Sequence, residues 1–548
     1  MFQQLQKQAM RHVRMVKVMA ASGVIRPYGP VKLAGVGKTI LDWGIGFAGG
    51  VGALAIRSPQ DVGLIDELGE LTWSEIDERA TRLAHGLKDV GVEEGDSVAL
   101  LCRNHRYFVE ASTALSKLGA DILYLNTAFS APQLGEVCER EQPAAIIYDD
   151  EFTNLIDKSG IDVARVIAWR GGETADVPQV EDLIEKGSSD KLPVPEHTTR
   201  PVILTSGTTG TPKGAPRGES SIDGAVALLS KIPFRAGGTT YIAAPLFHTW
   251  GWAHLNMAML LGSTMVLRRK FDAAECLETL QKYDCDALIV IPVMMQRIMR
   301  LGADERSGDF SKLKVVAASG SALPGDLATD WMDAFGDTLF NTYGSTEVAW
   351  ATIARPLDMR EAPGTAGKAP YNTVVKIYGE DGKLVEQGES GRIFVGNTML
   401  FGGYTGEQDE RKEMIDGLMS SGDIGRLDQE GRLFVEGRDD EMIVSGGENV
   451  FPKEVEDCLS RHDDVEDVAA IGIDDEDYGK RLRAFVVTSG EVDGDTLKAH
   501  VKHNLAGYKV PREIVFLDEL PRNSTGKVRK LDLKEYDAHG EPSRGSED

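Results

Sequence analysis

Residues 201–214 read PVILTSGTTGTPKG, an apolar run followed by glycines, hydroxyl side chains and one lysine. The first four residues predict a buried strand. Glycines let the following backbone turn and approach a ligand closely, and consecutive N–H groups in such a loop form a concavity that binds anions. We therefore predict a phosphate-binding loop, whose candidate contacts are Thr205, Ser206, Gly207, Thr208, Thr209, Gly210 and Lys213.

This loop differs from the Walker A loop of P-loop NTPases, which has the pattern G-x-x-x-x-G-K-[ST]. Pro212 stands where the second glycine of that pattern belongs, and Gly214 replaces the hydroxyl residue after the lysine. The sequence thus excludes a P-loop NTPase. The structural alternative is a surface loop rich in Gly, Ser and Thr, but such a loop has no reason to follow a buried strand in this order.

The chain before the loop alternates short apolar runs with amphipathic segments. Thr72 and Glu75 have the spacing of a capping box, and Gly91 is placed to end the helix that they open. The same pattern predicts strands at 97–102, 122–125, 144–148 and 166–169, and a helix near 111–118. This alternation predicts an α/β fold with parallel sheets covered on both faces.

The pattern changes after residue 354. Short strands separated by Gly and Asp turns at 374–378, 391–395 and 432–436 predict a small β unit. A compact α/β segment follows Arg438, and the last residues are polar. We divide the chain into a basic extension, a large domain, a small C-terminal domain and a polar tail, with the bounds 1–57, 58–438, 439–536 and 537–548.

Composition excludes several classes of protein. The 548 residues include 86 acidic and 60 basic side chains, a formal net charge of −26 that repels phosphate backbones, so we expect no nucleic acid partner. The 5 cysteines form no CxxC pair, which argues against a zinc site and fits a reducing cytosol. No apolar run reaches the ~20 residues of a membrane-spanning helix. We expect a cytoplasmic protein.

The N-terminal extension carries the opposite charge. Residues 1–57 hold eight Lys or Arg against one acid, Asp42. Apolar and basic residues interleave in the first twenty positions, which predicts a basic amphipathic helix. Such a helix lies either on the anionic inner face of a membrane or on the acidic body of the protein, and amphipathicity alone does not choose between them.

Six motifs occur in a fixed order along the chain: TSGTTGTPKG (205–214), PLFHTWG (245–251), NTYGSTE (341–347), SGD (421–423), GR…SGGEN (437–449) and PRNSTGK (521–527). With them the sequence closely resembles the adenylate-forming superfamily, in particular its bacterial long-chain fatty-acid–CoA ligases. The resemblance covers about residues 69–536. It implies a large N-terminal domain of stacked αβαβα sheets with a small β unit, followed by a small mobile α/β domain.

The resemblance implies a two-step reaction that uses ATP, Mg²⁺ and coenzyme A. A carboxylate attacks the α-phosphorus, pyrophosphate leaves, and a thiol then attacks the acyl-adenylate and releases AMP. Because two anions meet in the first step, positive potential at the site stabilises the transition state. Lys527 would supply part of it, with Thr346 touching phosphate and Glu347 holding Mg²⁺.

The remaining nucleotide contacts follow from motif positions in the same family. Tyr343 would stack on the adenine ring, and Asp423 and Arg438 would reach the ribose hydroxyls. The rest of the adenine site would be formed by Gly320, Ser321, Ala322, Asn341 and Gly344.

Between the two steps, the small domain would rotate about Asp440. The rotation would withdraw Lys527 and bring the loop at 445–449 into the site. Coenzyme A would then contact Gly446, Gly447 and Glu448.

The acid is expected beside the PLFHTWG motif. His248 would gate the carboxylate, or is an ordinary buried histidine, while Trp250, Gly251 and Trp252 would shape the acyl pocket. No Asp or Lys in this segment is placed to recognise a polar amino acid. We therefore predict a fatty acid as the substrate, without a defined chain length.

Several alternatives stay open. A fatty acyl-AMP ligase would load a carrier protein in place of coenzyme A, a luciferase would emit light, and a catalytically silent nucleotide-binding protein would act as an interaction module. The intact Lys527, Glu347 and Asp423 argue against the last of these. The chain could act as a monomer or as a homodimer.

Overall fold

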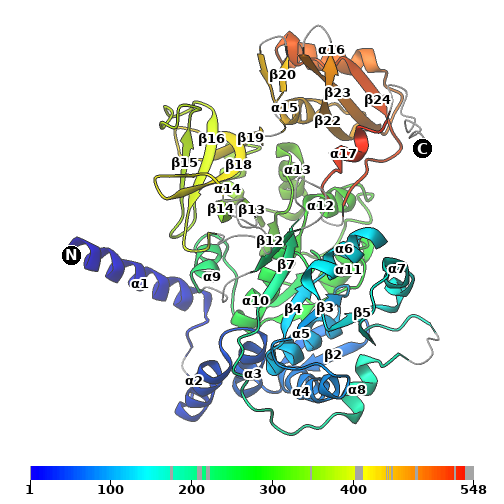
Figure 1. Ribbon diagram of the computed structural model, residues 1–548. Coiled ribbons are helices and arrows are strands. Elements are labelled where there is room, and N and C mark those ends of the chain that lie inside the picture. The colour runs from blue at the N-terminus through cyan, green and yellow to red at the C-terminus, as the bar shows by residue number, and fades with distance from the viewer. Residues whose placement is uncertain are drawn as a thin grey trace.

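The computed structural model describes residues 2–26, 28–172, 177–205, 213–216, 222–345, 348–400, 412–439, 441, 443–445, 448–475, 479–523 and 526–536. In this part of the chain the strands form four sheets. Figure 1 shows a large lower body that holds two of them, a β unit beside it, and a separate C-terminal unit above. This is the mixed α/β architecture that the sequence predicts.

The first sheet of the body is parallel except at its two edges. Its strands, in spatial order, are β14 (Ala349–Ala354), β13 (Leu339–Ser345), β12 (Val315–Ala318), β11 (Ala287–Val290), β9 (Thr239–Ile242), β10 (Thr264–Val266), β1 (Val62–Asp66) and β2 (Gly69–Thr72). The inner strands β11 and β12 are fully buried, as their unbroken apolar runs require.

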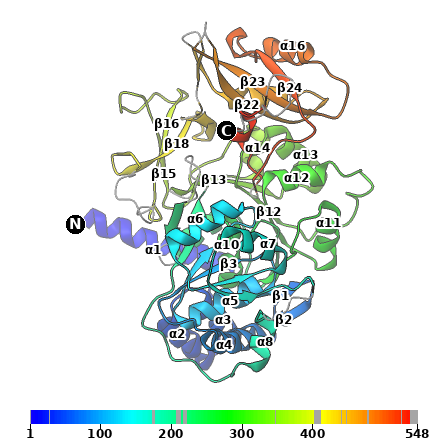
Figure 2. The ribbon, with the colours of Figure 1, turned by 45° about the vertical axis from the view of Figure 1, so that its right-hand side comes forward.

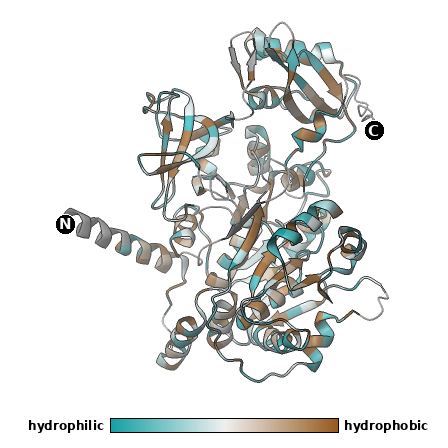
Figure 3. Cartoon of the chain, viewed as in Figure 1, coloured by the Kyte–Doolittle hydropathy of each residue, from teal (hydrophilic) through white to brown (hydrophobic). Residues whose placement is uncertain are grey.

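The second sheet is parallel except for its last strand. Its order is β6 (Ala164–Ile167), β5 (Ala145–Tyr148), β3 (Ser97–Leu101), β4 (Asp121–Tyr124), β7 (Pro201–Thr205) and β8 (Lys213–Pro216). The strands predicted before the phosphate loop are confirmed here to within two or three residues at each end. In Figure 3 the strands of the body are mostly coloured as hydrophobic.

One core joins both sheets to the helices that cover them. The helix α5 (Arg106–Leu118) is buried on nearly every side, and Phe108 stacks on Tyr124 of the second sheet at a ring distance of 5.2 Å. A helix without a solvent face must lie inside the fold. The other helices of the body are α3 (Phe47–Arg57), α4 (Trp73–Asp89), α6 (Ala131–Glu141), α7 (Thr153–Ser159), α8 (Val180–Lys186), α9 (Ile222–Leu229), α10 (Thr249–Leu261), α11 (Ala273–Lys282), α12 (Pro292–Met299), α13 (Gly325–Phe335) and α14 (Pro356–Glu361).

Local signals place α4 as the sequence predicts. The hydroxyl of Thr72 accepts from the N–H of Glu75, and the Glu75 carboxylate accepts from the N–H of Thr72, so the capping box is formed. The helix ends at Asp89, and Gly91 follows with φ +98°. The predicted cap and stop signal of this helix are both confirmed.

The β unit is antiparallel and lies beside the C-terminal unit, at the upper left of Figure 2. Its strands are β15 (Val374–Tyr378), β16 (Gly391–Gly396), β17 (Met414–Ile415), β18 (Leu418–Leu427) and β19 (Leu433–Arg438). The C-terminal sheet holds β20 (Ile443–Ser445), β21 (Glu448–Val450), β22 (Val465–Asp475), β23 (Gly479–Thr488) and β24 (Glu513–Phe516). Its helices α15 (Pro452–Leu459) and α16 (Gly494–Asn504) share one apolar cluster, and α17 (Lys530–Leu533) belongs to another.

The N-terminal extension forms α1 (Phe2–Ser22) and α2 (Pro30–Trp43). Figures 1 and 2 both show α1 projecting away from the body. The helix predicted for the first twenty residues is thus confirmed. Among the described residues, none of the helices combines the length and hydropathy needed to cross a bilayer.

Candidate active site

The predicted phosphate loop connects two paired strands. β7 and β8 are antiparallel, and Thr205 pairs with Lys213 in their register. β7 also pairs with the buried β4, so the two ends of the loop are fixed to the second sheet. The loop itself, with Ser206, Gly207, Thr208, Thr209 and Gly210, lies outside the described residues, and its phosphate contacts stay a prediction.

The predicted adenine contacts gather at the carboxyl ends of two neighbouring strands. β12 and β13 are parallel, with Ala318 opposite Asn341. The loop with Gly320, Ser321 and Ala322 follows β12 directly, and the hydroxyl of Ser319 donates to the carbonyl of Thr342 at 2.7 Å. The loop after β12 and the NTYGSTE motif are therefore adjacent, as ligand sites at the ends of parallel strands require.

Tyr343, on β13 beside Gly344, reaches the β unit through its hydroxyl. The hydroxyl donates to the carboxylate of Asp423 and lies 3.2 Å from the Ser421 hydroxyl. Asp423 is opposite Arg438 in the antiparallel pair of β18 and β19, with 3.7 Å between Nε and Oδ1. Burial, and next the Asp423 charge, raise the pKa of Tyr343 well above its usual value. The three predicted nucleotide contacts form one hydrogen-bonded and ionic cluster.

The PLFHTWG motif forms the loop before α10 and its first turn. Trp250 and Trp252 are buried, and the indole N–H of Trp250 donates to the carbonyl of Val290 at 3.0 Å. A Cβ at Gly251 would lie 2.2 Å from the carbonyl oxygen of Pro245, so only glycine lets α10 begin this close to the motif. The motif is thus held against β11 of the first sheet.

His248 is the N-cap residue of α10. Burial, and then the charge of Lys527, lower its pKa to about 3. The imidazole is therefore neutral at physiological pH. The charge of Lys527, from the C-terminal unit, thus acts on the segment of the body that is predicted to line the acyl pocket.

The loop that carries Lys527 is a tight hairpin. The N–H of Lys527 donates to Oδ1 of Asn523 at 2.9 Å, and its carbonyl accepts from the N–H of Asn523 at 2.8 Å. Gly526 has φ +76°, and a Cβ there would lie 2.4 Å from Cγ1 of Val293 in α12. Glycine is therefore needed both for the turn and for the close contact between the loop and the body.

Other contacts between the C-terminal unit and the body are ionic. Arg300 at the end of α12 donates to the carbonyl of Glu466 at 3.2 Å and lies 3.6 Å from its carboxylate. Arg461 lies 3.8 Å from Asp326 in α13. Motif reasoning missed these residues, because their role depends on pairing between distant segments.

The segment around the predicted pivot Asp440, which lies outside the described residues, is tied on both sides. The N–H of Asp439 donates to the carbonyl of Gly422 in β18 at 3.0 Å. On the other side Glu441 pairs with Lys530 at 2.8 Å, and Lys530 also lies 3.1 Å from Glu456.

Several further predicted residues have no described position. They are Thr346, Glu347, Gly446 and Gly447. Glu448 begins β21, in a hairpin with β20. The Mg²⁺ site and the coenzyme A contacts therefore stay predictions.

One buried residue beside the predicted acyl pocket was missed by the sequence reasoning. His254 contacts the ring of Trp250 edge-on at 4.0 Å, and its Nδ1–H donates to the carbonyl of Trp250 at 2.9 Å. Burial lowers its pKa to about 4, so its Nε2 is a neutral acceptor. Among the described residues, Nε2 has no hydrogen-bond partner.

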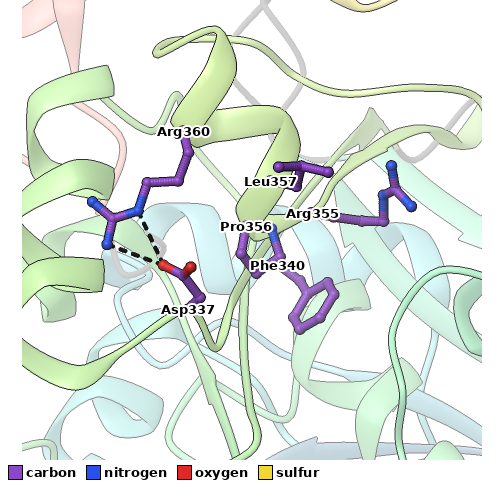
Figure 4. Close-up of a pocket in the computed structure, with 6 residues that line it drawn as sticks. All are labelled: Asp337, Phe340, Arg355, Pro356, Leu357 and Arg360. Atoms are coloured by element: carbon purple, nitrogen blue, oxygen red, sulfur yellow. Dashed lines mark hydrogen bonds and ion pairs between the residues drawn. The ribbon is translucent and has the colours of Figure 1, made fainter.

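Two other features lie apart from this site. A cavity of about 350 Å³ beside α14 is lined by Asp337, Phe340, Arg355, Pro356, Leu357 and Arg360 (Figure 4). None of the predicted site residues lines it, and the Arg360 guanidinium donates to Asp337 at 3.0 Å.

The second feature is a buried group of three potential metal ligands, Cys102, His105 and Asp149. Both ring nitrogens of His105 already have hydrogen-bond partners within the protein. His105 Nδ1 accepts from the N–H of Tyr107, and its Nε2 lies 2.8 Å from Asp149. We assign this group a structural role at the start of α5.

Comparisons with known proteins agree with this geometry. Residues 54–405 match the model of a family described as AMP-binding enzyme, and residues 454–527 match the AMP-binding enzyme C-terminal domain. The chain is 32% identical to a feruloyl-CoA synthase of Amycolatopsis sp over 85% of this chain and 93% of that protein. It is also 32% identical to an indoleacetate–CoA ligase of Aromatoleum aromaticum, over 88% and 95% of the two chains.

Among solved structures, an anthranilate CoA ligase in complex with anthranoyl-AMP has a TM-score of 0.80 at 25% identity. The likeness covers 88% of this chain and 96% of the other. It extends over both the body and the C-terminal unit.

Proposed function

The chain belongs to the AMP-binding enzyme family, and from this membership we propose that it joins an aromatic carboxylic acid to coenzyme A. The coarse activity, an ATP-dependent and AMP-forming acid–CoA ligase that works through an acyl-adenylate, follows from the family and from the named activities of its relatives. The proposal goes beyond this activity in three respects: the identity of the acid, the use of Mg²⁺ and the location of the protein in the cell. The observation that carries the ligase assignment is the position of the Lys527 hairpin against the body, where a Cβ at Gly526 would lie 2.4 Å from Val293 of α12.

The residues have separate roles in the proposed first step. Tyr343, Asp423 and Arg438 hold the nucleoside, and Lys213 lies at one end of the loop proposed to hold the phosphates. Lys527 adds positive charge between the acid and the α-phosphate, where two anions meet. Mg²⁺, held by Glu347, would neutralise further phosphate charge.

Two observations support an aromatic acid. Relatives that match this chain over more than four fifths of its length are named for ferulate and indoleacetate. The predicted pocket segment is itself aromatic, because Trp250 meets His254 and Trp350 edge-on at ring distances of 4.0 and 6.2 Å. Edge-to-face contacts with a flat ring add to the stabilisation from apolar burial.

His254 supports a further property of the acid. Its buried Nε2 lacks a donor among the described residues, and an unsatisfied buried acceptor is costly. A hydroxyl group on the acid would supply the missing donor. We therefore expect a hydroxylated ring to react better than the unsubstituted one, and we expect His254→Phe to abolish that preference.

A fatty acid, the substrate predicted from the sequence, is the second candidate. The apolar side chains of α10 that favour it, among them Leu255, Met257 and Met259, are buried. The relatives named above are not named for fatty acids. For the location, we propose the cytoplasm, with residues 1–57 touching the inner face of the membrane.

The test incubates the full chain with ATP, Mg²⁺ and a panel of acids, with and without coenzyme A. The panel contains ferulate, cinnamate, indoleacetate and palmitate, and mass spectrometry follows AMP, acyl-adenylate and acyl-CoA. We expect acyl-CoA from the aromatic acids at a rate at least about tenfold above palmitate. A higher rate with palmitate would instead support the fatty-acid assignment.

Two other outcomes would reject the proposed acceptor or the activity. Acyl-adenylate that accumulates without forming a thioester would indicate a carrier protein as the acceptor. The absence of AMP with every acid would indicate the catalytically silent module.

A further inference from the structure

Exposed large apolar side chains are concentrated in the N-terminal extension. Eight of the eighteen such residues in the described part of the chain lie between Val13 and Ile56. The two most exposed are both on α2, Leu41 at 87% and Val31 at 85%. Single exposed apolar residues are ordinary on a protein surface, but a group of them on one element is not.

Most of the exposed residues of α2 lie on one side of the helix. At 100° per residue, the exposed positions of α2 other than Pro30, its first residue, and Lys32 fall within one half of the helix circumference. They are Val31, Leu33, Ala34, Gly37, Lys38 and Leu41. We call this set the outward face of α2. Lys38 is its one charged member, whereas the solvent side of a surface helix is normally polar.

The opposite side of α2 packs against the body. A Cβ added at Gly35 would lie 3.2 Å from Ile56, and one added at Gly52 would lie 3.1 Å from Thr39, so α2 and α3 are in close contact. Lys32 donates to the carbonyl of Arg57 at 2.9 Å. Packing against α3 therefore fixes the orientation of α2. The outward face stays exposed because of this packing.

The segment before α2 is also attached. The guanidinium of Arg26 donates to the carbonyl of Ala236, and Arg235 donates to the carbonyl of Ala21. Arg14 of α1 lies over the ring of Tyr371 at 5.6 Å. These contacts attach the base of the extension to the protein surface, and α1 projects away from the body (Figure 1).

Charge decides between two partners for this face. Residues 1–57 are basic in a chain of net charge −26. A symmetric dimer through α2 would place two copies of the same basic segment opposite each other, because such an interface is isologous. An anionic lipid surface is instead complementary in charge, and it can also take up apolar side chains.

We propose that the outward face of α2 is a lipid-binding surface that seats the protein on an anionic bilayer. The apolar side chains enter the boundary between headgroups and acyl chains. Lys38, which pairs with Asp42 at 2.7 Å, lies at the edge of this face and contacts the headgroups. This inference rests on the membrane contact proposed for residues 1–57, and it assigns that contact to α2 in place of the first twenty residues.

The test measures cosedimentation of the full chain with vesicles of phosphatidylglycerol and phosphatidylcholine. We expect binding at low salt, release at high salt, and little binding to phosphatidylcholine alone. The double variant Val31→Asp and Leu41→Asp should bind at least about fivefold less. The matched control, Val374→Asp and Leu384→Asp, changes two exposed apolar residues of the β unit and should bind like the wild type.

Folding is checked by the activity of each variant on a soluble acid, which should not change. If the double variant is unfolded, Lys38→Gln, at a side chain that is 71% exposed, replaces it and should weaken binding at low salt. Wild-type binding by the double variant would overturn the assignment to α2, and failure of the wild type to bind would also overturn the membrane contact. A dimer in light scattering that the double variant abolishes would show that the face binds a second copy. None of these outcomes changes the proposed ligase activity.

Discussion

The side chain of Lys527 lies close enough to His248 for its charge, after burial, to help lower the pKa of that imidazole to about 3. His248 begins α10 in the body, and Lys527 belongs to a hairpin of the C-terminal unit. We propose that this is the arrangement of the first half-reaction. Because His248 is neutral, Lys527 would supply the positive charge that meets the incoming acid and phosphate.

The first prediction concerns Lys527→Ala. Removing one positioned positive charge should slow acyl-adenylate formation by a factor on the order of 100. Thioester formation from supplied acyl-adenylate should survive, because the lysine would have left the site by then. Rapid-quench measurement of each half-reaction checks this, with the exposed Lys534→Ala as the control. Equal losses in both halves would contradict the separate roles.

The second prediction concerns the pivot. Asp440→Pro fixes φ and removes an N–H donor between the anchored Asp439 and Glu441. We expect one half-reaction to be retained and the other to be strongly slowed, because the domain must rotate between them. Wild-type rates in both halves would show that the rotation occurs elsewhere.

The third prediction concerns Arg300 and the equilibrium between two positions of the C-terminal unit, the one seen here and the rotated one expected for thioester formation. Its contacts with Glu466 hold the C-terminal unit to the body, but its side chain is half exposed, so the pair contributes no more than about 1 kcal/mol. Arg300→Ala should therefore slow adenylation by no more than about fivefold and leave thioester formation unchanged or faster. The neighbouring Arg297→Ala is the control. A matching loss in thioester formation would indicate general damage to the fold.

The fourth prediction concerns pH and stability. Burial, opposed by backbone hydrogen bonds, raises the pKa of Asp286 to about 6. Because this folded-state pKa is above the unfolded value, the carboxyl favours folding when protonated, and that stability is lost as pH rises from about 4 through 6.

Asp286→Asn should therefore have a higher melting temperature than the wild type at pH 8, and the difference should shrink toward pH 4. Calorimetry over this range checks the prediction, with the exposed Asp304→Asn as the control. A constant difference at all pH values would mean that ionisation of Asp286 is not the cause.

Local signals in the sequence predicted the elements that carry the site. The apolar run at 201–204 becomes β7, and the capping box at Thr72 starts α4. Motif order also predicted that Tyr343, Asp423 and Arg438 serve one ligand, and the structure places them in contact. These features depend on short stretches of sequence, each of which is informative by itself.

Other features depend on how distant segments meet. The pairs of Arg300 with Glu466 and of Lys530 with Glu441 join residues whose charges are unremarkable in sequence. The outward face of α2 has the same apolar spacing as a face that packs on a core. Periodicity shows that a helix has an apolar side, but only the packing of α3 shows which side remains exposed.

The most direct test of the central claim follows an oxygen atom. The acid is supplied with both carboxylate oxygens as ¹⁸O, together with ATP and coenzyme A, and the products are analysed by mass spectrometry. If the carboxylate attacks the α-phosphorus and the thiol then breaks the acyl–oxygen bond, one ¹⁸O must appear in AMP and the other must stay in the acyl-CoA. Label in inorganic phosphate, with ADP as the nucleotide product, would contradict the acyl-adenylate mechanism.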